Sequence, residues 1–416
     1  MTIYKFPASF TQSRVVLTLL FLFPLLGNSV RSWTGSIFLL IFVASLFVKP
    51  WQRVSLRGWE RIISVAMPVA MFFMLLISCL FNGWTDEQTK GAAVFSRFLM
   101  FTGVYFLLRT EPQGPLAFAY GCVLAAFLLV LQGANDILIL GLERAYGVYG
   151  SPGLFAGQAF VFGLVCSLFA RESRSRPGAV IFGLGVTAAI VALLMSGSRS
   201  TFFAIFLMSA FYLFSARGKI HQSLSVLAII FLLGVAYLTV PSFGSQIDRS
   251  YQEVKSYITD RNVLSSSTHE SVGTRFELWR VGLLIAKDEP LIGVGWRNFS
   301  SATPNYVREG LANPAVLGHR HPHNTYIEFL VNSGVLGLSL LTMWGFALRY
   351  YSKLNLFGEN SNQSIWLRLY LGYLAAAGVN EGGLFIYGNS LSFYLMVLAV
   401  LLSTLHRAEF ENHHNA

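Results

Sequence analysis

Charged residues are scarce in this chain of 416 residues. Asp, Glu, Lys and Arg make up 12% of it, and hydrophobic residues make up 54%. Soluble domains carry roughly 25% charged residues, so the composition excludes an ordinary soluble domain. Apolar runs long enough to cross a hydrocarbon core recur along the chain, and we predict an all-α polytopic membrane protein with about twelve transmembrane helices. The expected spans lie near residues 15–30, 34–48, 62–80, 92–108, 115–133, 153–170, 178–196, 201–216, 224–240, 326–346, 365–382 and 386–405.

Cysteine is also rare, and its positions exclude two kinds of site. The chain has three cysteines, Cys79, Cys122 and Cys166, all inside expected spans. The long polar segment, residues 241–325, has none, which excludes a disulfide framework and a Cys-based metal site there. The polar segment also lacks an Asp-x-Asp motif, and no internal repeat indicates an inverted-repeat transporter. We expect no metal and no cofactor.

The net charge of +10 is mostly a topology signal. Short loops after even-numbered spans carry the basic residues, so both termini are predicted to be cytoplasmic and the polar segment to lie outside. The polar segment contains nine Lys/Arg and eight Asp/Glu. It is therefore nearly neutral, which argues against nucleic acid as a partner. The basic loop residues are Lys49, Arg53, Arg57, Arg61, Arg171, Arg174, Arg176, Arg217 and Lys219.

The polar segment divides the chain into three parts. Residues 1–240 are expected to form helices 1–9, and residues 326–416 helices 10–12 with a short cytoplasmic tail. Between them, residues 245–259 show an amphipathic helical pattern. A second helix is predicted from Thr274 to near Pro290, because Thr274 and Glu277 have the spacing of a capping box. Such helices lie on a membrane surface or form a lid without chemistry of its own.

Two arginines are candidates for binding an anion. Arg275 would be the first residue after the Thr274 cap, where helix amides and a guanidinium together favour phosphate. Arg199 lies in a short Ser/Gly-rich connection between two spans. The alternatives are an exposed surface arginine for Arg275 and a snorkelling one for Arg199. Further polar groups inside spans pair within the bundle or line a cavity; they are Arg97, Arg368, Asn380 and Glu381.

Three histidines close the polar segment at positions 319, 321 and 323. A zinc site is one interpretation, but alternate residues around Pro322 make a poor ligand set. A structural histidine that caps the next helix is the second. The third is a general base, because a neutral imidazole can take a proton from a sugar hydroxyl. Nearby guanidiniums would lower its pKa and keep it neutral. His323 is best placed for this role, since it directly precedes an apolar run.

These residues lie within a recognisable pattern. His323-Asn324, nine residues, Gly334, two residues and Gly337 resembles the His-Asn/Ser/Arg-x9-Gly-x-x-Gly/Thr/Tyr signature of bacterial O-antigen ligases. The segment Pro290-Leu-Ile-Gly-Val-Gly is similar to one common across the wider superfamily, which includes O-antigen polymerases and protein O-oligosaccharyltransferases. The length, the twelve-span layout and the large loop before the motif also resemble this family. The spacing of Gly334 and Gly337 indicates close packing within a membrane helix.

The resemblance implies an O-antigen ligase in the bacterial inner membrane, with its active site facing the periplasm. Its donor would be undecaprenyl-pyrophosphate-linked O-antigen, and its acceptor lipid A-core oligosaccharide, both among membrane lipids. The resemblance implies that Arg199 and Arg275 hold the pyrophosphate and that His323 activates the acceptor hydroxyl in a metal-independent inverting transfer. Arg320, His321 and Asn324 are candidates for acceptor contacts. The alternatives are an O-antigen polymerase, a transporter of polyprenyl-linked glycan and a protein O-glycosylating transferase.

Overall fold

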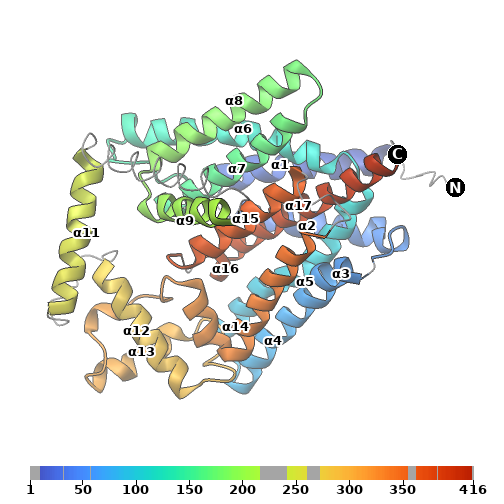
Figure 1. Cartoon of the computed structure of the whole chain (residues 1–416). Helices are drawn as coiled ribbons and strands as arrows, with labels where there is room; N and C mark the ends of the chain where they lie inside the picture. Colours follow the sequence, from blue (N-terminus) through green and yellow to red (C-terminus); the bar gives the residue numbers. More distant parts are fainter. Residues whose placement is uncertain are drawn as a thin grey trace.

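The computed structural model describes residues 10–30, 32–56, 58–215, 241–259, 272–354, 362–381 and 383–414. Every regular element within these ranges is helical, so the all-α prediction is confirmed (Figure 1). The helices are α1 (Phe10–Ser29), α2 (Trp33–Val48), α3 (Gly58–Arg61), α4 (Met67–Phe81), α5 (Asp86–Thr110), α6 (Gly114–Ala134), α7 (Pro152–Glu172), α8 (Arg176–Ser196), α9 (Arg199–Ser215), α11 (Pro241–Thr259), α12 (Val272–Asp288), α13 (Phe299–Arg308), α14 (Thr325–Tyr351), α15 (Asn362–Gly378), α16 (Gly383–Ile386) and α17 (Gly388–His414).

Most of these helices have the composition of membrane spans. Seven stretches in the described ranges are long and apolar enough to cross a bilayer, and α1, α2 and α9 contribute shorter apolar helices. The chain is therefore a multi-pass membrane protein. The count of twelve stays a prediction, and the expected span at 224–240 lies outside the described residues. The seven stretches are Gly58–Phe81, Asp86–Thr110, Gly114–Ile139, Pro152–Glu172, Arg176–Ser196, Thr325–Tyr351 and Gly388–His406.

The polar segment packs against one end of the bundle. Figure 1 shows α11, α12 and α13 together at this end, with α11 running across the direction of the bundle helices. α12 and α13 share a small core with α14, in which Leu278, Phe299 and Val331 are fully buried. Helix α13 was not expected from the sequence, because it is only ten residues long and contains Pro304. The described part of the polar segment therefore has three α-helices where two were predicted.

The predicted capping box at Thr274 is wrong. α12 already includes Val272, whose N–H donates to the Glu253 carboxylate of α11 at 2.9 Å. Glu277 turns inward instead of back toward the helix start. Its buried carboxylate accepts hydrogen bonds from Arg280, Tyr257 and the Asn313 N–H. Burial alone would raise the pKa of Glu277, but these bonds outweigh burial and lower it. Contacts with other parts of the chain therefore determine where the Glu277 side chain lies, and its spacing from Thr274 does not.

A break in α14 joins the polar segment to the bundle. Gly334 has φ +62° and ψ −167°, which only glycine adopts readily. The stretch 290–294 lies against this break: the Val335 N–H donates to the Pro290 carbonyl (2.8 Å) and the Val294 N–H to the Val331 carbonyl (2.8 Å). A Cβ on Gly334 would lie 2.2 Å from the Leu291 backbone. The two glycine-containing motifs of the sequence, the one that begins at Pro290 and the one that contains Gly334, therefore pack against each other.

Candidate active site

The site begins at the turn that starts α14. The Asn324 side chain accepts hydrogen bonds from the Tyr326 and Ile327 N–H groups, the geometry of an N-cap. Its amide also donates to the Val379 carbonyl at 2.9 Å. These hydrogen bonds use both ends of the Asn324 amide, so its role is to cap α14. Asn324 does not line the polar cavity described below. The preceding residue, His323, has φ +53°, a left-handed conformation uncommon outside glycine and asparagine.

The short stretch 379–381, after the end of α15, connects several candidate residues. The Arg275 guanidinium donates through Nη1 to the Asn380 carbonyl (3.2 Å) and to its Oδ1 (2.5 Å). The Glu381 carbonyl accepts from the Thr325 hydroxyl (2.6 Å), and its carboxylate accepts from Ser200 (3.3 Å). The starts of α9 and α14 and the arginine of α12 therefore meet at one turn. The sequence marked Asn380 and Glu381 only as polar groups inside a span.

Four guanidiniums gather beside this turn. Arg199 is exposed at the start of α9 and donates to the Ser250 hydroxyl of α11 at 2.8 Å. The charges of Arg144, Arg249 and Arg275 all act on Arg199, together with that of Glu253. We call Arg144, Arg199, Arg249 and Arg275 the arginine cluster. The carboxylates of Glu253 and Glu381 lie near it, and the gathering of four guanidiniums suits a polyvalent anion. The sequence identified two of its members.

The imidazoles of His321 and His323 lie against each other, with ring centroids 4.2 Å apart and ring planes tilted by 41°. The His323 backbone N–H donates to Nδ1 of His321 (3.2 Å), so neutral His321 carries its proton on Nε2. Burial, with smaller contributions from His319 and Arg275, lowers the pKa of His321 to about 4. Burial, His321, Arg275 and His319 lower the pKa of His323 to about 2. Both rings are therefore neutral at physiological pH, as the sequence predicted for a base.

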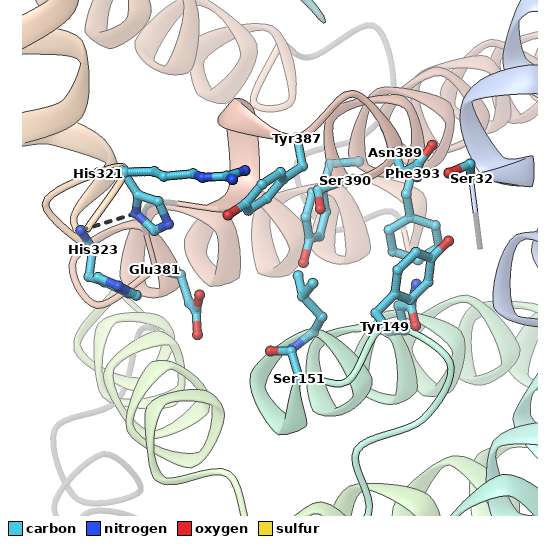
Figure 2. A pocket seen from close by; sticks show the side chains of 14 residues that line it. Ser32, Tyr149, Ser151, His321, His323, Glu381, Tyr387, Asn389, Ser390 and Phe393 are labelled. Atoms are coloured by element: carbon cyan, nitrogen blue, oxygen red, sulfur yellow. Dashed lines mark hydrogen bonds between the residues drawn. The ribbon is translucent and has the colours of Figure 1, made fainter. Parts of the chain in front are cut away.

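Both histidines line a cavity of about 390 Å³ in the end of the bundle, which we call the polar cavity. Figure 2 shows His321, His323 and Glu381 at one end of it, Tyr387 and Ser390 in the middle, and Ser32, Tyr149 and Asn389 at the other. The complete lining is Ser32, Tyr149, Ser151, Leu154, Gln158, Arg320, His321, His323, Glu381, Tyr387, Asn389, Ser390, Phe393 and Tyr394. Of the expected acceptor contacts, Arg320 and His321 line the cavity.

The arrangement brings together a positive cluster, a neutral imidazole and a polar cavity, in that order. Arg275 connects the first two, because its charge acts on both Arg199 and His323. Among the described residues, no group of three or more His, Cys, Asp or Glu side chains is arranged to hold a metal ion. Chemically, the site can bind an anionic leaving group at the arginine cluster and a hydroxyl compound in the cavity, with a neutral imidazole beside both.

Comparisons with known proteins give matches over parts of the chain. Residues 183–342 match the family model described as "O-Antigen ligase". An uncharacterized protein of Haemophilus influenzae is 23% identical over 276 residues, which are 65% of this chain and 68% of that protein. The exopolysaccharide production protein ExoQ of Rhizobium meliloti is 29% identical over 221 residues, 49% of this chain and 42% of ExoQ. The match therefore spans less than half of ExoQ.

Proposed function

We propose that the protein is an O-antigen ligase, because residues 183–342 match the model of the O-antigen ligase family. It transfers O-antigen polysaccharide from undecaprenyl pyrophosphate to lipid A-core. One observation carries the proposal. Arg199, Arg275 and His323 are spread over residues 199–323, yet they lie close enough at one end of the bundle for the charge of Arg275 to act on the other two. A leaving-group clamp and a base thereby share one site.

In the proposed mechanism, the arginine cluster holds the donor's pyrophosphate and stabilises the charge that develops on it as it leaves. Arginine suits this task because its planar fork stays charged and matches phosphate oxygens. His323 accepts the proton of the acceptor hydroxyl, whose oxygen bonds to the anomeric carbon. The bond from that carbon to the pyrophosphate oxygen breaks on the opposite face, which inverts the configuration. The guanidiniums thus do what a divalent metal does in other glycosyl transfers.

The low pKa of His323 has a consequence for pH dependence. In the free enzyme the imidazole is already deprotonated at any pH well above 2, and the bound pyrophosphate anion then raises its basicity. We expect kcat/KM for the donor, which reports the free enzyme, to stay level between about pH 8 and 5.5. An ordinary histidine with a pKa of about 6.5 would be about 90% protonated at the lower limit. A tenfold fall per pH unit below 6.5 would contradict this assignment.

The donor's lipid tail needs an apolar path that starts near the head-group site. An apolar groove of about 320 Å³ runs between α14, α15 and α17, from Thr325 at one end to Arg349. Tyr394 lines both this groove and the polar cavity. The Thr325 hydroxyl, at the groove, donates to the carbonyl of Glu381, which lines the cavity. We propose that the first isoprene units of the donor lie in the groove.

Filling the groove should weaken donor binding. Gly345 lines the groove, and a Cβ added to it meets no atom within 4 Å, so we expect Gly345→Phe to fold normally with its ring in the groove. We expect KM for the donor to rise roughly tenfold, about 1.4 kcal/mol, the contribution of about two buried methylene groups. Gly183→Phe on α8 is the matched control, because Gly183 also has open space around it. Equal donor KM values in the two variants would remove the groove from the proposal.

The location also belongs to the proposal. We propose twelve spans, with residues 1–240 forming the first nine, residues 241–325 a periplasmic loop and residues 326–416 the last three and a cytoplasmic tail. The supporting arrangement is visible in Figure 1: the described start of α1 and the end of α17 lie at the end of the bundle opposite α11–α13. The basic loops predict cytoplasmic termini and a periplasmic site. The inner membrane is the location that the proposed ligase activity implies.

Loss of the gene tests the ligase proposal against its neighbours. A cell without a ligase should carry no O-antigen on its lipopolysaccharide but should accumulate the lipid-linked polymer. A cell without an O-antigen polymerase, which uses the same donor, should keep a single O-antigen unit on each core. A cell without a transporter should accumulate the lipid-linked glycan at the cytoplasmic face. The second or third result would overturn the ligase assignment.

A further inference from the structure

Several polar side chains in the polar cavity have hydrogen-bonding capacity to spare. The Gln158 amide and the hydroxyl groups of Tyr387 and Ser390 make no hydrogen bond to any residue that the structure describes. Ser390 is 9% exposed and Gln158 is half-buried, whereas Tyr387, which also lines the cavity, is 38% exposed. Polar groups buried like those of Ser390 and Gln158 cost stability unless a ligand or water satisfies them. Their common orientation toward one cavity therefore points to a polar ligand.

Aromatic rings border the same space. Tyr387, Phe393 and Tyr394 line the cavity beside the free polar groups, and Tyr149 closes its far end (Figure 2). The Tyr149 hydroxyl is occupied, since it donates to the Gly27 carbonyl at 2.6 Å, so its contribution is the ring. A sugar ring has apolar C–H faces and hydroxyl groups around its edge. Aromatic faces combined with amide, hydroxyl and carboxylate groups, here including Glu381, match that pattern.

The position of the cavity relative to His323 indicates which sugar it holds. Arg275 is hydrogen-bonded to Asn380, the neighbour of Glu381, and Figure 2 shows Glu381 at the histidine end of the cavity. With the pyrophosphate on the arginine cluster, an acceptor hydroxyl in the cavity would approach the anomeric carbon from the other side. Inverting displacement needs this order, because the nucleophile must approach that carbon from the face opposite the leaving group. A hydroxyl in the cavity is also the one that His323 can reach, since His323 lines it.

We propose that the polar cavity is the acceptor subsite: it binds the saccharide unit that carries the nucleophilic hydroxyl, with Gln158, Tyr387 and Ser390 hydrogen-bonding its other hydroxyls. This assignment rests on the proposed glycosyl transfer. It divides the site into a donor side, formed by the arginine cluster, and an acceptor side, formed by α7 and the start of α17. Gln158, Tyr387 and Ser390, which no sequence motif marks, then contribute to the acceptor specificity of the protein.

Two conservative variants test the subsite. Gln158→Met removes the amide and keeps the side-chain length, and Tyr387→Phe removes one hydroxyl. Each lost hydrogen bond to the acceptor should raise the KM for lipid A-core roughly two- to tenfold and leave the KM for the lipid-linked donor unchanged. Tyr350→Phe is the control, since Tyr350 is 51% exposed near the other end of α14. Thermal unfolding of each variant identifies a folding defect, and Ser390→Ala then serves as a milder third variant.

A binding experiment separates this proposal from the proposed function. The purified protein is titrated calorimetrically with core oligosaccharide released from lipid A, without donor. Weaker binding to Gln158→Met and Tyr387→Phe than to the wild type supports the subsite, even in a preparation that transfers nothing. A raised donor KM with an unchanged acceptor KM would assign the cavity to the donor's sugar and overturn the proposal. Unchanged values of both constants, with wild-type oligosaccharide binding, would also overturn it.

Discussion

Replacing His323 with asparagine is expected to lower the rate of glycan transfer by about 10²- to 10⁴-fold, the usual contribution of a general base. Asparagine is the substitution of choice because His323 has φ +53°, a conformation that asparagine tolerates better than alanine. The backbone N–H that donates to His321 is also preserved. Affinity for the lipid-linked donor should stay within about twofold, because the arginine cluster is untouched. The measurement is single-turnover transfer together with donor binding.

His319→Asn is the matched control for this variant. His319 is also a buried imidazole of the same stretch, with its ring centroid 5.8 Å from that of His323, but it does not line the polar cavity. It should keep most of the wild-type rate. Full activity of His323→Asn would exclude the general-base role. A large loss in both variants would instead assign the histidines a shared structural role.

Arg275→Lys is expected to reduce transfer on the order of a hundredfold, the loss typical of one donor to a developing oxyanion. Lysine keeps the positive charge but loses the planar fork that matches two phosphate oxygens at once. The effect should appear mainly in kcat, because stabilisation of the leaving pyrophosphate develops in the transition state. Steady-state kinetics with varied donor concentration measures this division.

Arg308→Lys is the control for the loss of a guanidinium fork. Arg308 is exposed at the end of α13, where its only described hydrogen bond joins it to Asn305, and the variant should behave as wild type. Asn380→Ala provides an independent check, since it removes the side chain that orients Arg275. It should lower kcat less than Arg275→Lys does. An Arg275→Lys enzyme with wild-type kcat would show that charge alone suffices and that the fork has no role.

The positions of the membrane helices could be predicted because they depend mainly on the local content of apolar residues. Apolar runs identify membrane helices without knowledge of their neighbours, and the described helices fall where such runs were expected. The errors occur where tertiary contacts decide. Thr274 and Glu277 have capping-box spacing, yet Glu277 is buried with Tyr257, Arg280 and Asn313, residues distant or unremarkable in sequence. The break at Gly334 depends on the stretch 290–294 lying against it, which no local pattern reveals.

The site was predictable to a similar extent. His323, Arg199 and Arg275 were found because short motifs mark them. Arg144 and Arg249 were not, because each is a single arginine in an ordinary stretch and joins the cluster only through the fold. Gln158 and Tyr387 carry no sequence signal either: an unpaired polar group is recognised only when the cavity it faces is known. The sequence therefore marked two arginines of the proposed donor side and two lining residues of the polar cavity, Arg320 and His321, and the structure adds the rest of the proposed acceptor side.

The central claim is that this protein joins a lipid-linked glycan to lipid A-core, and reconstitution tests it most directly. The purified protein is placed in liposomes with undecaprenyl-pyrophosphate-linked O-antigen and lipid A-core, and the products are separated and their new linkage examined by NMR. The account predicts O-antigen attached to lipid A-core, with anomeric configuration opposite to that in the donor. Lengthening of the lipid-linked glycan with no product on lipid A-core would contradict it.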